Sequence, residues 1–269
     1  MSSGDGGARA EIGVFGGSGF YELLTGADEV RVTTPYGEPS APPVVGTLGG
    51  RRVAFVPRHG AGHRYPPHRI PYRANLWAMR ELGVTQVLGP CAAGSLQPGV
   101  HPGDFVVCDQ LVDRTSGRAQ TFYDDRAVHV SFADPYCPSG RAAALAAARE
   151  AGIRAHDGGT MVVVEGPRFS TRAESRWYSS LGWSVINMTG HPEAVLAREL
   201  ELCYTSVALI TDYDVGVPGV PPVTADEVFR VFSSNNERLR TLLDHLVPAL
   251  PVERTCACGS ALTGADFSG

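Results

Sequence analysis

Seven short apolar runs, separated by segments with helical periodicity, constrain the fold of this 269-residue chain more than any other feature. The runs are rich in Val, Ile and Phe, as buried strands are, and the segments between them repeat apolar residues at three- and four-residue steps, as helices do. Alternation of this kind predicts an α/β fold. The runs are EIGVFGG (11–17), RRVAFVP (51–57), VTQVLGP (84–90), GDFVVCD (103–109), TMVVVEG (160–166), WSVINMT (183–189) and CYTSVALIT (203–211); the helical segments are YRANLWAMRELG (72–83), RAAALAAAREAG (141–152) and HPEAVLARELEL (191–202).

No long linker rich in proline, serine or glycine separates these runs, so one domain is favoured over two. We expect a single α/β domain over residues 11–250, with a central mixed, largely parallel, twisted sheet flanked by helices. Residues 1–10 are expected to form a disordered lead and residues 251–269 a C-terminal tail. A last helix is predicted within 223–247, with Thr224 as its N-cap and Glu227 completing a capping box.

Composition and charge exclude several classes of protein. An apolar content of 43% and a charged content of 19% are ordinary for a folded globular chain. Acidic residues outnumber basic ones by 28 to 23, and no run of Lys or Arg could neutralise a phosphate backbone. No apolar run reaches membrane length, and the N-terminus lacks the apolar segment of a secretory signal. We therefore expect a cytoplasmic protein that binds neither nucleic acid nor membrane.

The six cysteines do not resemble the dense framework of a small secreted domain. Four stand alone in the sequence and are expected to be buried, reduced thiols: Cys91, Cys108, Cys137 and Cys203. The pair Cys256 and Cys258 offers too few thiols for a structural zinc site, so no metal is expected. A strained disulfide, a bridge to another cysteine and two inert thiols remain open for this pair, and the last is favoured in a reducing cytosol.

Ligands of open α/β sheets bind beyond the carboxyl ends of the strands, so the residues that follow each run are informative. The glycine turn at 16–19, which contains Ser18, can bring backbone N–H groups and a hydroxyl to an anion, although a plain turn explains it equally well. Arg58 offers a planar fork to phosphate oxygens, and His59 can donate beside it. His63 and His68 follow, but without a nearby Cys or acidic ligand they do not indicate a metal site.

Two later strand ends suit a flat ring and an anion. Phe169 can stack on a ring and Ser170 can contact an anion; Met188 can pack under an apolar group and Thr189 offers a hydroxyl. Taken singly, an exposed phenylalanine and a core methionine are the simpler interpretations.

The last apolar run is followed by TDYDVG (211–216), in which Asp212 and Asp214 point to the same side of an extended chain while Tyr213 points away. An ordinary solvated turn is the simpler interpretation of this hexapeptide alone. Two like carboxyl groups that crowd one another raise the pKa of one of them, which suits a general acid.

Taken in their order along the chain, the residues that follow the predicted strands resemble those of the trimeric purine nucleoside phosphorylases. The resemblance covers nearly all of residues 11–250, and its longest matching stretches are GTMVVVEGPRFSTRAES (159–175) and INMTGHPEAVLAREL (186–200). It implies phosphorolysis, in which inorganic phosphate is the co-substrate and no cofactor is needed. Cys91 stands where relatives often carry Thr, and a thiol is the weaker donor. The implied phosphate-binding residues are Ser18, Arg58, His59, Ala92 through its backbone, Ser170 and Thr189.

The resemblance also assigns the nucleoside. Enzymes of this family that act on 6-oxopurines carry Asn at the first strand-end position, whereas 6-aminopurine enzymes carry Asp, as this chain does at Asp212. Asp212 would protonate purine N7 as the general acid, and an ionised Asp214 would accept from the exocyclic amine. Met188 would pack under the ribose and Phe169 beside the base.

Ala225 and Val228 correspond to positions beside the 5′ substituent, where small apolar residues suit methylthio better than hydroxyl. His129 matches a residue that enters the neighbouring subunit's site, which implies a homotrimer with shared active sites. We therefore expect phosphorolysis of 5′-methylthioadenosine to adenine and 5-methylthioribose 1-phosphate in purine and methionine salvage.

Other functions remain open at this stage. An apolar 5′ pocket cannot sharply reject another 5′-modified adenosine, such as a halogenated one. A phosphorylase for 6-oxopurine nucleosides or methylthioinosine is a second alternative, against which the Asp pair argues. A nucleoside-binding regulatory protein without turnover and a hydrolase that uses water are the alternatives from other classes.

Overall fold

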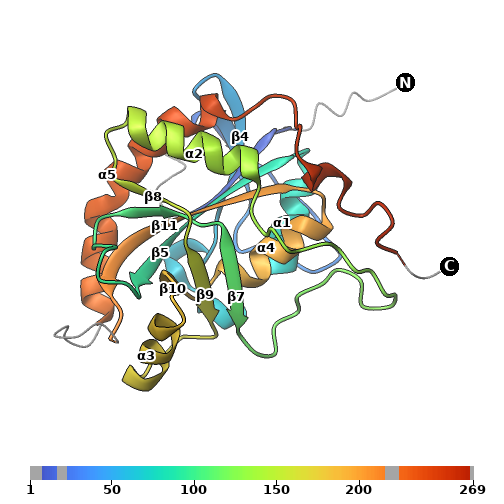
Figure 1. Cartoon of the computed structure of the whole chain (residues 1–269). Helices are drawn as coiled ribbons and strands as arrows, with labels where there is room; N and C mark the ends of the chain where they lie inside the picture. Colours follow the sequence, from blue (N-terminus) through green and yellow to red (C-terminus); the bar gives the residue numbers. More distant parts are fainter. Residues whose placement is uncertain (1–7, 17–22, 216–223, 267–269) are drawn as a thin grey trace, which may run out of the picture.

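The computed structural model describes residues 8–16, 23–215 and 224–266. One mixed β-sheet forms its centre, with helices on both faces (Figure 1). Helices α2 (Pro138–Glu150) and α5 (Ala225–Ala249) pack on one face, and α1 (Tyr72–Glu81) and α4 (Gly190–Glu199) on the other. The predicted single α/β domain with a mixed, largely parallel sheet is confirmed.

The described strands include every one of the seven predicted from the apolar runs. Four strands were not predicted: β2, β3, β7 and β8. All five residues of β2 are exposed, and β7 has only two half-buried residues, so neither forms an apolar run. In chain order the strands are β1 (Ile12–Gly16), β2 (Thr25–Glu29), β3 (Val44–Leu48), β4 (Arg51–Pro57), β5 (Gln86–Ser95), β6 (Phe105–Val107), β7 (Gln110–Arg114), β8 (Ala155–Asp157), β9 (Thr160–Val164), β10 (Val185–Asn187) and β11 (Cys203–Tyr213).

Helix α3 (Arg172–Ser180) was also missed, because its polar sequence buries only Ser175 and Tyr178. Its start carries a capping box in which the Glu174 amide donates to Thr171 Oγ1 and the Thr171 amide donates to the Glu174 carboxylate. The described chain also contains the short 3-10 helices η2 (Ala61–His63), η3 (Pro67–Arg69) and η4 (Ala257–Ser260). The capping box predicted at Thr224 involves the Glu227 side chain, which lies outside the described residues.

Strand β5 joins the two halves of the sheet and positions the candidate site. It runs parallel to β1 and β11, whereas its last residues pair antiparallel with β10. Gly94 therefore lies opposite Ile186 of β10 and opposite Asp212 of β11. Because β10 runs against β5, the chain that leaves β10 at Asn187 lies beside Ala92. Segments far apart in the sequence thus meet at the end of β5.

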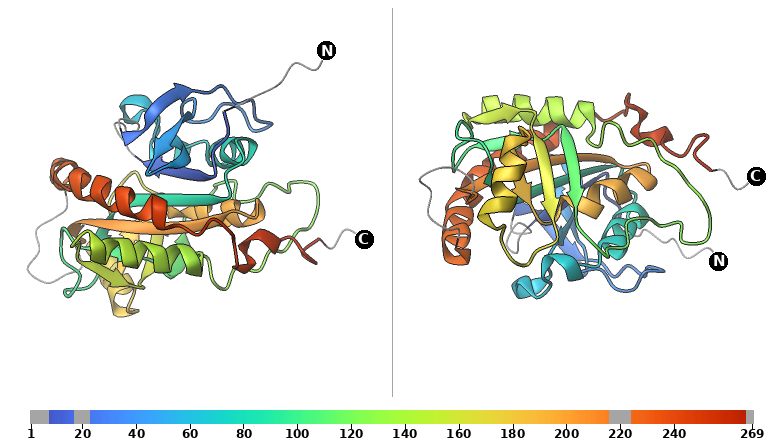
Figure 2. Two further views of the ribbon diagram at one scale, coloured as in Figure 1. Left: turned by 90° about the horizontal axis from the view of Figure 1, so that it is seen from above. Right: turned by 60° about the horizontal axis from the view of Figure 1, so that its bottom comes forward.

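A long connection between β7 and α2 projects from the body on the same side as the C-terminal segment (Figures 1 and 2). Val128 of this connection forms a β-bridge with Asp266, and Arg126 Nη1 lies 2.7 Å from Asp266 Oδ2. The end of the described chain is therefore attached to the projecting connection. Across the described residues, no helix is both long and apolar enough to cross a membrane.

Candidate active site

Two buried carboxyl groups lie together at the end of β11. Asp212 is 8% exposed and Asp214 is 3% exposed. A Cβ atom built on Gly94 would lie 3.1 Å from Asp212 Oδ1 and 3.5 Å from Asp214 Cβ, so both side chains lie over this glycine. The register shifts between Ile210 and Asp212, and such a bulge re-aims the side chains that follow it. The predicted pair is therefore brought together on one side of the chain, and it is buried rather than part of a solvated turn.

The two carboxyl groups differ in their surroundings. Thr211 Oγ1 donates to Asp212 Oδ2 over 2.7 Å. Asp214 Oδ2 is buried and has no hydrogen-bond partner within the described part of the chain. Burial, followed by the negative charge of Glu174, raises the pKa of Asp214, against the opposing effects of hydrogen bonds from Ser175, Ser170 and the Val215 amide. From the sequence, crowding of the pair favours a protonated Asp212 beside an ionised Asp214; in the structure the pKa of Asp214 is itself raised, and burial is the main cause.

The absence of a side chain at Gly94 makes room for this pair, which predicts the effect of the Gly94→Ala substitution. The new methyl group would lie 3.1 Å from both Asp212 Oδ1 and Ile186 Cγ2, closer than ordinary van der Waals contact. We expect kcat/KM to fall by about 10²-fold, because small displacements of catalytic groups have effects of that size. Gly99→Ala is the matched control, since no atom lies within 4 Å of its Cβ position. Equal activity of the two variants would show that the pair tolerates displacement.

Arg58 lies at the end of β4 in a buried ion pair. Its Nε and Nη2 each donate to the Glu193 carboxylate over 2.8 Å, and its Nη1 donates to the Pro90 carbonyl over 2.9 Å. Tyr204 also donates to Glu193, over 2.6 Å. Burial lowers the pKa of Arg58, but the charge of Glu193 and its hydrogen bonds together outweigh burial, so the net shift is upward. Because a guanidinium group has five N–H bonds, one on each Nη remains for a further anion.

Asn187 connects two other candidate phosphate ligands. Its Nδ2 donates to the Ala92 carbonyl over 3.1 Å and to Thr189 Oγ1 over 3.3 Å. Its Oδ1 accepts from the amides of Thr189 and Gly190 at the start of α4. The structure thus brings Ala92 and Thr189 together, and α4 carries Glu193 to Arg58. Sequence reasoning did not single out Asn187 or Glu193, although both belong to the matching stretch INMTGHPEAVLAREL (186–200).

His59 is half-buried beside Arg58 and stacks on His63, with ring centroids 3.9 Å apart. Burial is the main cause that lowers the pKa of His59 to about 4, so the imidazole is neutral at pH 7. The Tyr65 carbonyl can only accept, so Nδ1 carries the proton and donates to it over 2.9 Å. The remaining Nε2 is an acceptor. His59 was predicted to donate to phosphate, and this is corrected: its free Nε2 is an acceptor. Such an acceptor suits a phosphate oxygen that carries a proton.

The residues of the GPRFS loop lie on the side of the carboxyl groups. The Ser170 hydroxyl interacts with Asp214, and Phe169 is 38% exposed. Met188 is half-buried, and its Sδ would lie 2.6 Å from a Cβ atom at Gly166. Exposure of Phe169 and partial exposure of Met188 leave both side chains accessible to a ligand.

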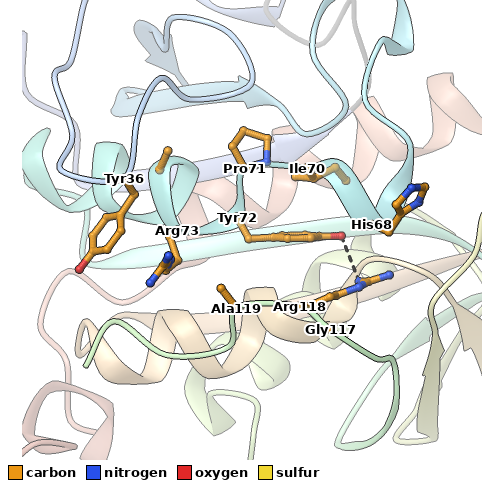
Figure 3. Close-up of a pocket in the computed structure, with 10 residues that line it drawn as sticks. Tyr36, His68, Ile70, Pro71, Tyr72, Arg73, Gly117, Arg118 and Ala119 are labelled. Atoms are coloured by element: carbon orange, nitrogen blue, oxygen red, sulfur yellow. Dashed lines mark hydrogen bonds between the residues drawn. The ribbon is translucent and has the colours of Figure 1, made fainter. Parts of the chain in front are cut away.

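Arg118 is a half-buried residue, with a side chain that is only 3% exposed, and sequence reasoning missed it. It donates to the backbone carbonyls of Met188, His191 and Glu165 over 3.0, 2.6 and 2.7 Å. It thus holds the loop after β9 against the loop after β10. Figure 3 shows its hydrogen bond to the Tyr72 hydroxyl at the edge of a 240 Å³ pocket. A lone Arg in a polar segment gave no signal for this role.

A comparison with protein families decides the assignment of this arrangement. Residues 11–248 match the model of the family described as "Phosphorylase superfamily". The chain belongs to the phosphorylase superfamily. A nucleoside and inorganic phosphate are the substrates that this family assignment supports.

Individual relatives of this phosphorylase-superfamily chain are close to it in sequence and structure. A purine nucleoside phosphorylase of Streptomyces coelicolor is 59% identical, with 96% of each chain covered. An S-methyl-5′-thioadenosine phosphorylase of Mycolicibacterium smegmatis is 57% identical over 91% of this chain and 93% of its own. A crystal structure of methylthioadenosine phosphorylase from an antarctic soil metagenomic library superposes with a TM-score of 0.93 at 41% identity, covering 98% of this chain and 94% of that one.

The remaining predicted site residues of this phosphorylase lie elsewhere or outside the described residues. Ser18 lies outside them, as do the side chains of Ala225 and Val228. His129 is exposed on the projecting connection, where its amide donates to the Ala265 carbonyl over 2.8 Å. It borders a second pocket, of 480 Å³, together with residues of the C-terminal segment.

Proposed function

We propose that this pentosyltransferase catalyses the phosphorolysis of 5′-methylthioadenosine to adenine and 5-methylthioribose 1-phosphate. The observation that carries the proposal is the spacing of two groups along β5. Arg58 donates to the Pro90 carbonyl and Asn187 joins Thr189 to Ala92, whereas the carboxyl pair lies over Gly94, two residues beyond Ala92. Two strand residues span about 7 Å. A ribose between these positions has an anion on one side and a proton donor on the other.

The carboxyl pair supports an adenine leaving group. As the bond from the anomeric carbon to N9 breaks, the purine gains negative charge, and protonation at N7 stabilises it. Asp212 donates that proton, and Asp214 accepts a hydrogen bond from the exocyclic amine. Asp214 Oδ2 is buried without a partner within the described residues, so a ligand amine would remove an unsatisfied acceptor. The O6 atom of a 6-oxopurine cannot donate to it.

Inorganic phosphate supplies the nucleophile in this account. Arg58 offers its two remaining N–H bonds, Thr189 and Ser18 their hydroxyl groups, and the Ala92 segment its backbone. His59 Nε2 accepts a hydrogen bond from the P–OH group of phosphate, since the Nδ1 proton is donated to the Tyr65 carbonyl. The new bond joins a phosphate oxygen to the anomeric carbon, and the proton lost by phosphate replaces the one that Asp212 gave to the base. No cofactor is required. Ser170 is a further phosphate candidate from the family resemblance, and in the described structure its hydroxyl interacts with Asp214.

The remaining predicted residues are assigned to the other parts of the nucleoside. Met188 lies under the ribose and Phe169 beside the base. Ala225 and Val228 form an apolar wall for the methylthio group, and His129 closes the site of a neighbouring subunit in a cytoplasmic homotrimer. Exposure of His129 on a projecting connection is compatible with a contact to another copy of the chain. The products enter purine and methionine salvage.

A second candidate is phosphorolysis of purine nucleosides in general, because the 59% identical Streptomyces coelicolor relative bears that name. Another 5′-modified adenosine, such as a halogenated one, is a variant of the main proposal. The two candidates differ in the base that they release and in the 5′ group that they require.

Initial rates with 5′-methylthioadenosine, adenosine and 5′-methylthioinosine, each with and without phosphate, test the proposal. We expect kcat/KM for methylthioadenosine to exceed that for methylthioinosine by about 10²-fold or more, since the inosine compound leaves buried polar groups unpaired. Adenosine should be the poorer 6-amino substrate because its 5′-hydroxyl enters an apolar wall. Preference for the inosine compound or equal use of all three would favour the second candidate.

A further inference from the structure

Four cysteines from three separate segments meet near the start of β11. Cys137 is the N-cap of α2, Cys203 is the first residue of β11, and Cys256 and Cys258 belong to the C-terminal segment. All four Sγ atoms lie within 4.8 Å of one another. Sequence analysis counted only the CAC pair and found too few thiols for a metal. The structure corrects that count to four.

These cysteines do not fill the main hydrophobic core. Cys137, Cys203 and Cys258 are 1%, 3% and 4% exposed, and Cys256 is half-buried. They form a cluster of their own, separate from the hydrophobic clusters on the two faces of the sheet. A buried thiol that serves only as a small apolar group contacts other apolar side chains, as Cys91 and Cys108 do in the core. Mutual contact of four thiols calls for another explanation.

The distances between the sulfur atoms match a tetrahedral metal site. With zinc–sulfur bonds of about 2.3 Å, the sulfur atoms of a tetrahedral site are about 3.8 Å apart. Cys256 Sγ lies 3.7 Å from Cys137 Sγ and 3.4 Å from Cys203 Sγ. We propose that Cys137, Cys203, Cys256 and Cys258 bind one Zn²⁺ ion in a closed, structural tetrathiolate site.

Two sources of positive charge lie beside the cluster and suit the thiolate form that a metal ligand must adopt. Cys137 lies at the positive end of the α2 dipole, which stabilises a negative charge. The Arg254 guanidinium lies close to Gly259, 3.1 Å from the position of a Cβ atom there, and adds a positive charge beside the CAC segment. Four thiolates and Zn²⁺ carry a net charge of −2, which these groups partly offset.

The proposed ion attaches the C-terminal segment to the body of the protein. The segment is otherwise held by polar contacts, among them Arg254 Nη1 to the Glu201 carbonyl at 2.6 Å and the Leu262 amide to Glu201 Oε1 at 3.2 Å. Its far end pairs with the connection that carries His129. Loss of the metal should therefore loosen both segments. The proposed metal site does not depend on the proposed function. Only the significance of a loosened His129 rests on that function.

Metal analysis of the full-length protein, produced with zinc and a reductant and then freed of loose metal by gel filtration, tests the site directly. We expect about one Zn²⁺ per chain, released when a mercurial reagent blocks the thiols. The protein produced with Co²⁺ instead should show the intense visible absorption of tetrahedral thiolate-bound cobalt. Absence of bound metal, or an intact mass lowered by two hydrogens for each pair of cysteines, would overturn the proposal in favour of free thiols or disulfides respectively.

Variants locate the ion within the chain. The Cys256→Ser/Cys258→Ser double variant should lose the bound Zn²⁺, because it leaves only two thiolates. Cys108→Ser is the matched control, since Cys108 is also buried but lies in the core away from the cluster. It should retain one Zn²⁺ per chain. Retention of zinc by the double variant would contradict the assignment, and if that variant fails to fold, the cobalt spectrum of the unaltered protein decides.

Discussion

Substitution of Asp212 by Asn is expected to lower kcat/KM for 5′-methylthioadenosine by about 10²- to 10⁴-fold, the usual contribution of a general acid. Asparagine keeps the shape of the side chain but cannot transfer a proton to N7. The Thr211 hydroxyl, which now donates to Asp212 over 2.7 Å, can donate equally to the amide oxygen. The structure should therefore persist while the chemistry is lost.

Steady-state rates with methylthioadenosine and methylthioinosine measure this effect and separate it from a structural one. Loss of the acid should appear mainly in kcat, and the penalty should be smaller for the inosine compound, whose base the amide can recognise. Asp124→Asn is the control, because the Asp124 side chain is 68% exposed and pairs only with Arg73 among the ion pairs described. A decrease of less than 10-fold for Asp212→Asn would mean that the proton comes from another group.

Replacement of Glu193 by Ala is expected to destabilise the protein by about 3–5 kcal/mol, the cost of removing one partner from a buried ion pair. Glu193 is fully buried and accepts three hydrogen bonds, two from Arg58 and one from Tyr204. Without it, the Arg58 charge remains in a buried site without compensation. KM for phosphate should rise as well, because the guanidinium loses its fixed orientation.

Urea unfolding at one fixed protein concentration measures the stability change. Asp124→Ala provides the contrast, since it breaks a largely exposed pair that is worth about 0–1 kcal/mol. The double variant Arg58→Met/Glu193→Leu should regain much of the lost stability, because no charge is left buried, yet it should not bind phosphate. A cost below about 1 kcal/mol for Glu193→Ala would show that Arg58 finds other partners or water.

The parts of the fold that were predicted are those that bury continuous apolar runs. Strands β5 and β11 are almost wholly buried, and their sequences show it. Strands β2 and β7 were missed because their exposed residues carry no such pattern. The antiparallel direction of β10 was also not predictable, since three residues contain no information about the partner strand.

The site residues divide in the same way, into those that local sequence predicts and those that it does not. Asp212 and Asp214 follow a recognisable strand, so their position could be inferred from the sequence. Glu193 was not predicted, because its role depends on Arg58, which lies 135 positions away. The four clustered cysteines come from positions 137, 203, 256 and 258, and no local spacing indicates that they meet. Contacts between distant segments were thus the part that required the structure.

Phosphate dependence of base release is the most direct test of the central claim, that the site directs phosphate and not water to the anomeric carbon. The protein is incubated with 5′-methylthioadenosine in phosphate-free buffer and again with inorganic phosphate; adenine is followed by chromatography and the sugar product by ³¹P NMR. The account predicts adenine only when phosphate is present, with one equivalent of 5-methylthioribose 1-phosphate for each adenine. Equal release of adenine without phosphate, or a free sugar product, would contradict it.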